Sequence, residues 1–413
     1  MRHLTGLSKW VHLLRALSKG DGGGLNLKLL CHVINGLRHE KPTVLDGKTY
    51  LGMGYPPLGS RAHRTATAGL QRVRRGERPL MIVNFAVTAR CTMDCVYCSA
   101  RNFRPGPDLS TERLIELAHE AQDLGCYKVN LTGGEPCLRD DLPEIAAELD
   151  DRSYVMLLSS GAGFPRMARR LRDAGVAAAS FSLDSFDEAT QNRRRGNNHA
   201  LEIAVRAAKT AIALGFYTGL QMFPDDALTL SAMTDYVNAA ARLGVHKVLL
   251  LAPRPCVALG RDAGACLSPK TLDFLRRCQG HFNRMRHVPA VMSTDDTERP
   301  ETHGCTGGFM QVYVHAQGDV TPCPFYPIAF GNVNEMSLAD AFNRMLRYHP
   351  LPGPECNLVE VFGLIRDVPD DALPVKDPAV IDRVYEQLHA RPRPLPRFWR
   401  CLGLANGRPS CDV

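Results

Sequence analysis

The residues of this chain that could do chemistry are three closely spaced cysteines. Cys91, Cys95 and Cys98 have the spacing Cys-x3-Cys-x2-Cys, and Tyr97 precedes the last of them. Three thiolates on one short loop can hold three corners of a cubic iron–sulfur cluster and leave the fourth iron without a protein ligand. An iron left open can bind a substrate or a cofactor, whereas a cluster held by four cysteines usually transfers electrons only.

A zinc knuckle is the alternative for these cysteines. Zinc takes four closed tetrahedral ligands, usually from two well-separated pairs of residues. No fourth ligand stands at that distance, since the next candidates are His119 and Cys126. The triplet therefore favours a cluster with an open iron over a zinc site.

Length and composition limit the class of protein. A chain of 413 residues is long enough for two domains, or for one large barrel with an appendage. Its 14 cysteines are irregularly spaced and no secretory signal precedes them, which predicts metal-bound thiolates in a reducing cytoplasm. No apolar run approaches the length that spans a bilayer. The net charge of +7 comes with basic clusters that lack interleaved aromatic residues, so nucleic acid is not an expected partner.

Residues 1–79 are predicted to form an N-terminal helical extension. Apolar residues recur at three- and four-residue steps from Arg2 to Lys19, with basic side chains opposite, and a second such segment runs from Leu25 to Leu37. These helices either pack on the body of the protein, or the first lies on a membrane surface or a hydrophobic substrate. No strand–turn–strand alternation is expected before residue 80, and Gly54 to Gly59 predicts a turn-rich connector.

Residues 80–299 alternate between strand-like and helix-like patterns. Strands are predicted at 81–87, 127–131, 154–158, 177–183, 217–223 and 247–251, and helices at 111–124, 142–149, 164–174, 199–214, 229–243 and 268–286. Six β–α units in a row predict an α/β fold, a partial (β/α)6 TIM-like barrel with its functional loops after the strand carboxyl ends. The first strand runs directly into the cysteine loop.

The β–α rhythm stops after Arg299. Residues 300–360 predict a small, cysteine-rich α+β unit in which Gln311 to Val314 and Val320 form a hairpin around Gly318-Asp319. Residues 361–413 are predicted to be a proline-rich tail.

The cysteine loop resembles the signature of the radical S-adenosylmethionine (radical SAM) superfamily. So does Gly133-Gly134-Glu135-Pro136, at the end of the second predicted strand, and the two motifs in this order are far more specific than either alone. The resemblance implies that the three cysteines hold a [4Fe–4S] cluster and that Gly133, Gly134 and Glu135 bind SAM. The amine and carboxylate of SAM would chelate the open iron.

Other loops are similar to SAM-contacting segments of the family. Ser182 and Asp184, after the fourth strand, resemble the segment that contacts the ribose. Ser159-Ser160-Gly161 stands where many relatives have Thr-Asn-Gly. Arg195 is a candidate for the SAM carboxylate, with an ordinary solvated charge as the alternative.

The mechanism that the resemblance implies is reductive. The reduced cluster gives one electron to the SAM sulfonium, and the carbon–sulfur bond breaks to give methionine and a 5′-deoxyadenosyl radical. That radical removes hydrogen from an unactivated carbon, while the protein supplies orientation and excludes water. The electron is expected from an external donor such as flavodoxin or ferredoxin.

Residues 300–360 resemble the SPASM or twitch auxiliary-cluster modules of the superfamily. Cys305, Gly318 and Cys323 have the spacing Cys-x12-Gly-x4-Cys, and Cys356 is the expected third ligand, with buried thiols as the alternative. No Cys-x2-Cys-x5-Cys-x3-Cys run follows, so one auxiliary [4Fe–4S] cluster is expected rather than two. Its fourth ligand is open among Cys401, Cys411 and substrate. Six other cysteines are expected to be buried apolar residues: Cys31, Cys126, Cys137, Cys256, Cys266 and Cys278.

The preferred substrate class is a small-molecule or lipid-like biosynthetic intermediate. A peptide-modifying maturase is the first alternative, and a non-catalytic iron–sulfur or zinc protein is the second. Peptide-modifying relatives often carry a small winged-helix domain before the barrel, which the expected lack of strands before residue 80 argues against. Carboxylates within reach of the strand ends are Asp225, Asp226, Asp295 and Glu298. None of them is singled out as a general acid or base, and ordinary surface carboxylates are the alternative.

Overall fold

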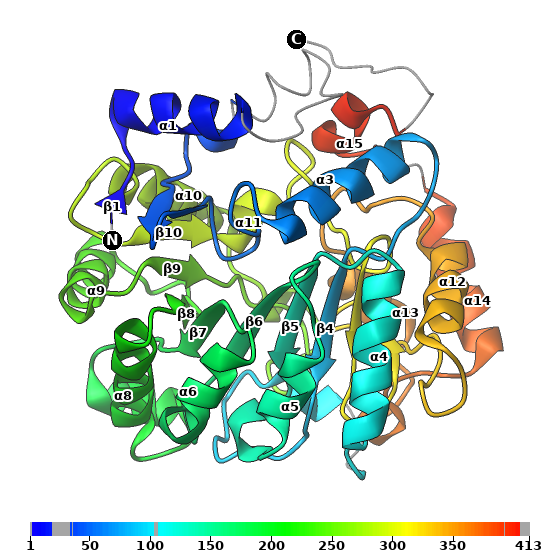
Figure 1. The fold of residues 1–413 in the computed structure, drawn as a ribbon. Helices are drawn as coiled ribbons and strands as arrows, with labels where there is room; N and C mark the ends of the chain where they lie inside the picture. The colour runs from blue at the N-terminus through cyan, green and yellow to red at the C-terminus, as the bar shows by residue number, and fades with distance from the viewer. Residues whose placement is uncertain (1, 19–33, 35, 103–105, 392, 405–413) are drawn as a thin grey trace.

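A nine-stranded, mostly parallel sheet forms the centre of the molecule (Figure 1). The computed structural model describes residues 2–18, 34, 36–102, 106–391 and 393–404. Most of the expected helix from Leu25 to Leu37 lies outside these residues. The strand order is β10-β9-β8-β7-β6-β5-β4-β11-β12.

Six of these strands are the predicted ones. They are β4 (Ile82–Ala86), β5 (Lys128–Thr132), β6 (Tyr154–Ser159), β7 (Ala178–Ser182), β8 (Tyr217–Met222) and β9 (Lys247–Leu250). Neighbours pair in parallel along this series. Alternate residues such as Val83, Phe85 and Val129 are fully buried in the main core, which explains why the strands are rich in apolar and β-branched residues.

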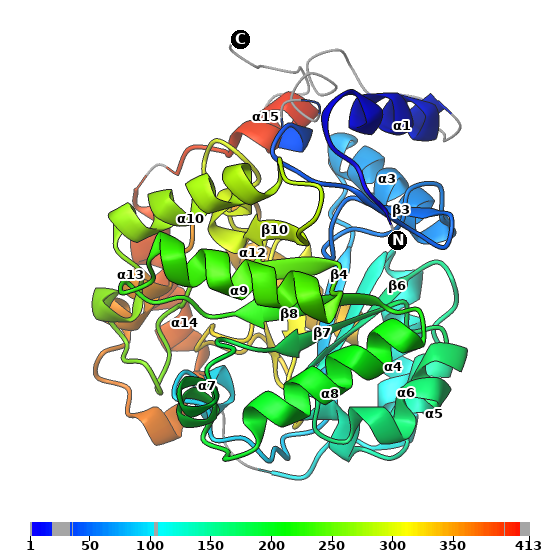
Figure 2. The same ribbon diagram turned by 90° about the vertical axis from the view of Figure 1, so that its left-hand side faces the viewer.

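Helices cover the outer face of this sheet (Figures 1 and 2). The six predicted ones are α4 (Thr111–Asp123), α5 (Leu142–Ala147), α6 (Phe164–Asp173), α8 (Ala200–Ala213), α9 (Leu230–Leu243) and α10 (Pro269–Phe282). A short helix that the sequence did not predict, α7 (Glu188–Arg195), stands between β7 and α8 and ends at Gly196. The partial α/β barrel is therefore confirmed.

The sheet is extended at both ends by strands that were not assigned to it from the sequence. Strand β10 (Ala290–Ser293) pairs in parallel with β9. The predicted hairpin is present as β11 (Gln311–Val314) and β12 (Val320–Thr321), and β11 pairs in parallel with β4. The auxiliary unit therefore shares a sheet with the strand that leads into the cysteine loop.

The expectation that no strands precede residue 80 is wrong. Three short strands, β1 (Arg2–His3), β2 (Thr43–Leu45) and β3 (Lys48–Tyr50), form an antiparallel sheet. The missed signal is the Asp46-Gly47 turn, where both residues have positive φ angles of 48° and 72°. Asp-Gly is a preferred pair for such a two-residue hairpin turn. Helices α1 (Gly6–Ser18) and α3 (Arg61–Arg74) complete this part, and only α1 was predicted.

The N-terminal residues close the amino end of the barrel. The Tyr50 ring stacks on Tyr217 of β8 with 4.2 Å between ring centroids, and Met53 is buried beside them. Helix α1 packs on the rest of the N-terminal region, since Leu13 and Lys9 are buried and the Lys9 ammonium donates to the carbonyl of Leu37. Among the residues that the structure describes, no helix has the length and apolar character needed to cross a membrane.

Helices also follow strand β10, and the last three of them extend into residues 361–404, where the sequence predicted a proline-rich tail. The helices are α11 (Thr294–Thr297), α12 (Leu338–Tyr348), α13 (Leu358–Leu364), α14 (Pro378–His389) and α15 (Arg397–Leu402). Single 3-10 turns occupy Ser99–Asn102, Pro136–Leu138, Ala263–Ala265 and Asp370–Ala372. Trp399 of α15 shares a buried cluster with Ala66 and Val73 of α3, so the two end regions of the chain pack together.

Candidate functional site

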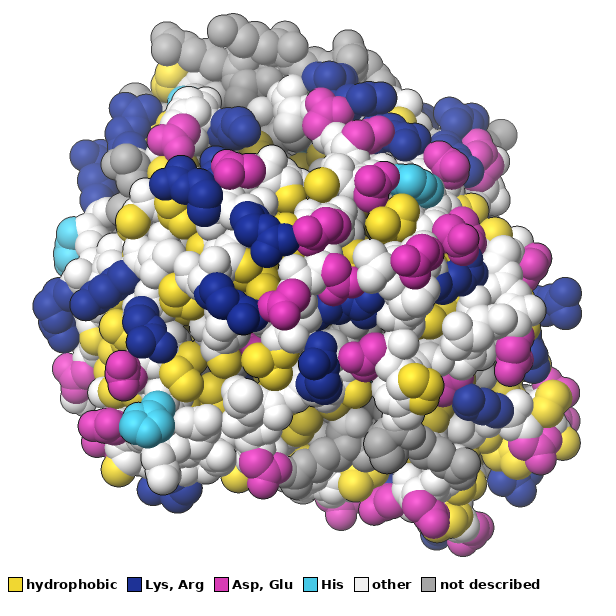
Figure 3. All heavy atoms as spheres, turned by 60° about the horizontal axis from the view of Figure 1, so that its bottom comes forward, with side chains coloured by type: hydrophobic (Ala, Val, Ile, Leu, Met, Phe, Trp, Pro, Cys, Tyr) yellow, Lys and Arg dark blue, Asp and Glu magenta, His cyan; other side chains and the backbone are white. Residues whose placement is uncertain are grey.

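The three signature cysteines lie where β4 ends, at the carboxyl edge of the parallel sheet. This edge is at the bottom of Figure 1 and faces the viewer in Figure 3, where charges of both signs are interspersed. Cys91 is exposed, Cys95 and Cys98 are half-buried, and all three thiols are free. Burial raises the pKa of Cys91 to about 11, and the nearby Glu135, Cys95 and Cys98 contribute to the rise. Cys91 therefore lies within electrostatic reach of the other three side chains.

The Gly-Gly-Glu turn packs directly on the cysteine loop. The Gly134 N–H donates to the carbonyl of Thr88, and the Glu135 N–H to that of Arg90, both at 2.7 Å. A Cβ atom at Gly133 would lie 2.4 Å from the Thr88 oxygen, and one at Gly134 would lie 2.3 Å from the Arg90 oxygen. The two glycines are therefore required by the contact between the two loops, a reason that the sequence did not reveal.

Glu135 joins this turn to the serine segment after β6. Its carboxylate is fully buried and accepts hydrogen bonds from the Ser159 hydroxyl and the Ser160 N–H, both at 2.7 Å, and from the Cys137 N–H at 3.1 Å. Burial raises the pKa of Glu135, and the bonds from the two serines oppose that rise. The structure thus brings together the two segments that the sequence had matched to SAM contacts separately.

The Asp184 carboxylate is buried and used by the chain itself. It accepts hydrogen bonds from the Tyr97 hydroxyl and from the Phe223 N–H, the latter at 2.8 Å. It also pairs with Arg195, whose Nη2 lies 3.2 Å from Oδ1. Ser182, in contrast, is half-exposed at the end of β7, and its carbonyl accepts from Gln191. The ribose role expected for Asp184 thus competes with internal contacts.

Arg195 is buried, so the alternative expectation of an ordinary solvated charge is wrong. The residue is 5% exposed, and its Nη1 lies 3.8 Å from the Cys95 sulfur. Its guanidinium also lies over the Tyr97 ring, 5.1 Å from the centroid. A buried cation therefore contacts one of the signature cysteines.

The second set of cysteines also comes together. Cys305, Cys323 and Cys356 are free and half-buried. The Cys305 and Gly353 backbones exchange two hydrogen bonds of 2.9 Å, which bring the segment of Cys356 to Cys305. Burial raises the pKa of Cys305 to about 12 and that of Cys323 well above its ordinary value, and the neighbouring thiols add to both shifts.

Three residues that the sequence did not place here adjoin this second set. Arg254 forms an ion pair with Glu298 and lies within electrostatic reach of Cys356 and Cys266. Cys266 is half-exposed, so its expected burial is wrong. The sequence could have indicated this group only by its place in the chain. Arg254 and Cys266 lie in the long loop after β9, at the carboxyl edge of the sheet.

The remaining cysteines fall into three groups. Cys126, Cys137, Cys256 and Cys278 are buried, as expected. Cys401 is buried and disulfide-bonded, so it does not serve as the fourth auxiliary ligand. Cys31 and Cys411 lie outside the described residues.

The donor type at both positions fits iron–sulfur clusters. Each set offers three free thiols, the ligands that such clusters take. Among the described residues, no three Cys, His, Asp or Glu side chains gather closely enough to hold a single metal ion.

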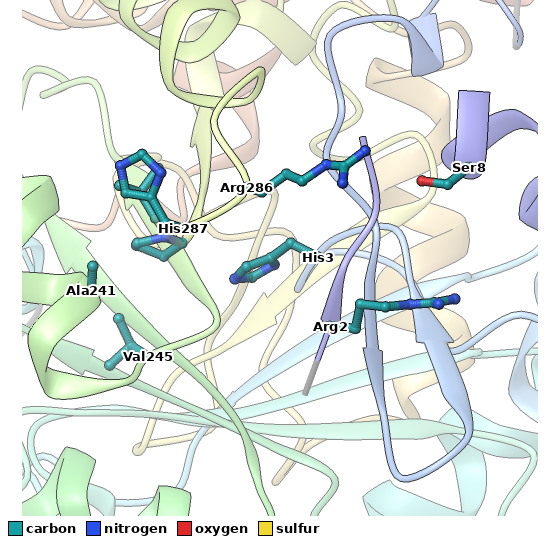
Figure 4. A pocket seen from close by; sticks show the side chains of 9 residues that line it. Arg2, His3, Ser8, Ala241, Val245, Arg286 and His287 are labelled. Atoms are coloured by element: carbon teal, nitrogen blue, oxygen red, sulfur yellow. The ribbon is translucent and has the colours of Figure 1, made fainter. Parts of the chain in front are cut away.

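A surface pocket lies at the opposite edge of the sheet. Its volume is about 440 Å³, and Arg2, His3, Arg286 and His287 line it beside Val245, as Figure 4 shows. Val245 precedes β9 and His287 precedes β10, so the pocket adjoins the amino ends of the strands. It is therefore separate from both sets of cysteines.

Comparison with known families decides what these motifs are. A family model described as the radical SAM superfamily matches residues 85–252, and one described as an iron–sulfur cluster-binding (SPASM) domain matches residues 305–357. The chain belongs to the radical SAM superfamily. A [4Fe–4S] cluster, SAM and auxiliary iron–sulfur binding come with these two domains, which confirms the cofactors expected from the sequence.

Two curated relatives illustrate the range of the family. GTP 3′,8-cyclase of Acidothermus cellulolyticus is 36% identical over 151 residues, which is 34% of this chain and 42% of that relative. The chain therefore spans less than half of the cyclase. AdoMet-dependent heme synthase of Methanosarcina barkeri is 24% identical over 303 residues, covering 66% of this chain and 85% of the relative.

The fold is similar to that of a solved radical SAM structure. Streptococcus suis SuiB bound to S-adenosylmethionine gives a TM-score of 0.55 at 14% identity, covering 75% of this chain and 80% of SuiB. SuiB has also been solved with its precursor peptide, SuiA. At this identity the likeness extends to the fold alone. The roles of individual site residues and the domain boundaries at 79, 299 and 360 stay predictions.

Proposed function

We propose that this chain reductively cleaves SAM and uses the resulting radical to abstract hydrogen from an unactivated carbon of a small organic molecule. Cys91, Cys95 and Cys98 would hold the cluster that binds SAM, and Cys305, Cys323 and Cys356 an auxiliary [4Fe–4S] cluster. When bound, the first cluster supplies the electron that breaks the carbon–sulfur bond of SAM. The chain supplies orientation and shields the reaction from water.

One observation carries this proposal: the Gly-Gly-Glu turn is hydrogen-bonded to the loop that bears the cysteines. The two 2.7 Å bonds from Gly134 and Glu135 fix a buried carboxylate beside Cys91. A carboxylate in that position can bind an ammonium group, such as the amine of SAM, next to an open iron. Binding and electron delivery would then occur at adjacent atoms.

The test is anaerobic reconstitution followed by iron counting and an assay for 5′-deoxyadenosine with dithionite as reductant. We expect about eight irons per chain, the content of two cubane clusters, and release of 5′-deoxyadenosine. The Cys91→Ala variant should lose the product and about four irons. Cys278→Ala, which removes a buried thiol on α10, is the matched control and should retain both. Zinc without iron in the wild type would end the proposal and favour a zinc protein.

A small-molecule substrate is favoured by the relatives. The match to this chain covers 85% of the heme synthase, and the cyclase is named for a nucleotide. Both names describe reactions on small molecules. Substrates related to either can be screened by the increase in 5′-deoxyadenosine that a true substrate causes over the substrate-free rate.

A peptide substrate is the second candidate, and the N-terminal sheet favours it. The expected lack of strands before residue 80 was the ground for discounting a peptide, and that ground is gone. Strand β3 is an edge of the three-stranded sheet, and an extended peptide can add to such an edge. A precursor peptide encoded beside the gene, and stimulation of 5′-deoxyadenosine release by it, would replace the small-molecule proposal.

The proposed partners follow from the cofactors. A flavodoxin or ferredoxin would supply the electron, and a reducing cytoplasm would keep the thiols of both sets free. Membrane contact through residues 1–19 stays a prediction, and the burial of Leu13 leaves less apolar surface for it. Flotation with anionic liposomes, with and without those residues, tests it.

A further inference from the structure

We infer that Arg195 is a positioning residue for the first cluster: it donates a charged hydrogen bond to the Cys95 thiolate and, held by Asp184, makes the cluster easier to reduce. This rests on the proposed function only in requiring that a cluster binds at the three cysteines. The role differs from the SAM-carboxylate contact that the sequence suggested for Arg195.

The guanidinium of Arg195 lies between Cys95 and Asp184 inside the protein. Its Nη1 is 3.8 Å from the Cys95 sulfur. Its Nη2 is 3.2 Å from Asp184 Oδ1, and its Nε is 3.2 Å from Asp184 Oδ2. Both terminal nitrogens therefore have hydrogen-bond partners within the chain, Nε lies beside the same carboxylate without a hydrogen bond, and the planar fork is fixed in direction.

Asp184 is in turn held from two further elements. It accepts from the Tyr97 hydroxyl in the cysteine loop and from the Phe223 N–H after β8. The Tyr97 and Phe223 rings stack with 4.4 Å between their centroids. The buried ion pair is thus supported from both sides, which a buried charge pair requires if it is not to destabilise the fold.

The end of α7 also binds the backbone of the cysteine loop. The Asp94 N–H donates to the carbonyl of Arg195 at 2.9 Å, and the Val96 N–H to that of Arg194 at 3.1 Å. A Cβ atom at Gly196 would lie 2.4 Å from the Asp94 oxygen, so only glycine allows this approach. Arg195 and Cys95 are therefore fixed relative to each other by main-chain bonds as well as by their side chains.

A fixed cation beside a cluster ligand changes the reduction equilibrium. Reduction adds one electron to the cluster, so the reduced form carries one more negative charge than the oxidised form. Hydrogen bonds to the ligand sulfurs and nearby charge are among the factors that set cluster potentials. At a buried position the charge is poorly screened by water. Arg195 therefore favours the reduced cluster, and Asp184 opposes it.

The experiment is a reductive titration of the reconstituted enzyme without SAM, followed by electron paramagnetic resonance of the first cluster. Cys305→Ala in the background of every sample removes the auxiliary signal. We expect Arg195→Gln to lower the ratio of reduced to oxidised cluster at a fixed potential about tenfold, which is roughly 59 mV for one electron. Asp184→Asn should raise that ratio. Arg193→Gln, an exposed neighbour on the same helix, should leave it unchanged.

Opposite signs for the two variants separate this role from a purely structural one, since loosening the loop would shift both variants in the same direction. Arg195→Lys keeps the charge and should recover at least half of the shift, which covers the case in which Arg195→Gln loads iron poorly. Equal potentials in the wild type and the Arg195→Gln and Asp184→Asn variants would overturn the inference, and where Arg195→Gln loads no iron, equal potentials in the wild type and Asp184→Asn would do so. Failure of the wild type to bind a cluster would instead overturn the proposed function.

Discussion

Glu135 is the residue at which the two halves of the candidate SAM site meet. Its carboxylate is bonded to the Ser159 hydroxyl and the Ser160 N–H and lies within electrostatic reach of Cys91. We predict that Glu135→Gln weakens SAM binding about tenfold to a hundredfold, because a hydrogen bond to a charged group contributes roughly 1.5–3 kcal/mol. Equilibrium dialysis with labelled SAM measures this.

The matched control for that prediction is Glu144→Gln. Glu144 is an exposed carboxylate on α5 whose partner is Arg170 at the surface. It should leave SAM affinity and iron content unchanged. If Glu135→Gln binds SAM as tightly as the control while retaining its iron, Glu135 has no role in binding the amine.

At the level of single residues, the sequence predicted which residues belong to the site better than it predicted which side chains they contact. The thiols and the Gly-Gly-Glu turn were found because their spacing is local. The partners of Asp184 were not, since Tyr97 and Phe223 come from two loops and Arg195 from the end of α7, which only the folded sheet brings together.

At the scale of elements, a buried lysine helps to anchor the N-terminal segment to the barrel. The Lys41 ammonium is fully buried and donates to the carbonyls of Phe282, Met285 and Val288, at 3.0, 2.8 and 2.9 Å. These carbonyls lie at and after the end of α10, where backbone acceptors lack helical partners. Lys41 thus connects the strand β2 region to the end of that helix.

We predict that Lys41→Met lowers the free energy of unfolding by about 1–3 kcal/mol, because it removes the lysine donor from the carbonyls of Met285 and Val288. Thermal or urea unfolding measures the change. The control is Lys48→Met, at an exposed position in the β2–β3 hairpin, which should change stability by less than about 0.5 kcal/mol. Equal stability of the two variants would contradict the anchoring role.

The same lysine predicts a dependence of stability on pH. Burial, with Lys247 adding to it, lowers the pKa of Lys41 from 10.5 to about 7. Between these values the unfolded chain binds more protons at this site than the folded chain, so the contribution of Lys41 to the free energy of unfolding rises with pH from about 7 to 10.5. Lys41→Met should lose that rise, and urea titrations at pH 7 and 9 would show it. An unchanged pH slope in the variant would contradict the shift.

The strands and helices of the barrel were predicted within one or two residues, except α10, whose C-terminal end was placed four residues too late, and α1 begins four residues later than predicted. The predicted 111–124 helix is α4 (Thr111–Asp123), and the 154–158 strand is β6 (Tyr154–Ser159). Strand β10 was missed because its four residues have no periodicity of their own and depend on pairing with β9. The addition of β11 to β4 spans more than 200 residues of sequence, which no local pattern encodes.

At the scale of the whole molecule, the C-terminal helices complete the auxiliary unit. The Tyr385 hydroxyl, on α14, is 2.8 Å from that of Tyr326 and 2.5 Å from His349 Nε2. Tyr326 lies three residues after Cys323 and within electrostatic reach of Cys305 and Cys323. The Ala329 and Val375 backbones are joined by a 3.0 Å hydrogen bond. The segment after residue 360, which was expected to be a proline-rich tail, therefore supports the second set of cysteines.

This arrangement predicts that Tyr385→Phe loosens the auxiliary site and leaves the first cluster intact. The substitution deprives the buried Tyr326 hydroxyl and His349 of a partner, which costs about 1–3 kcal/mol. Local opening should then become about tenfold more frequent, since roughly 1.4 kcal/mol corresponds to a factor of ten. Anaerobic release of iron to a chelator should be faster by that factor, and only for the half of the iron that the auxiliary site holds.

Tyr348→Phe is the control, because the Tyr348 hydroxyl bonds to Asp382 at the surface. Identical rates of iron release in the wild type, Tyr385→Phe and Tyr348→Phe would show that the Tyr385 contact of α14 does not stabilise the auxiliary site.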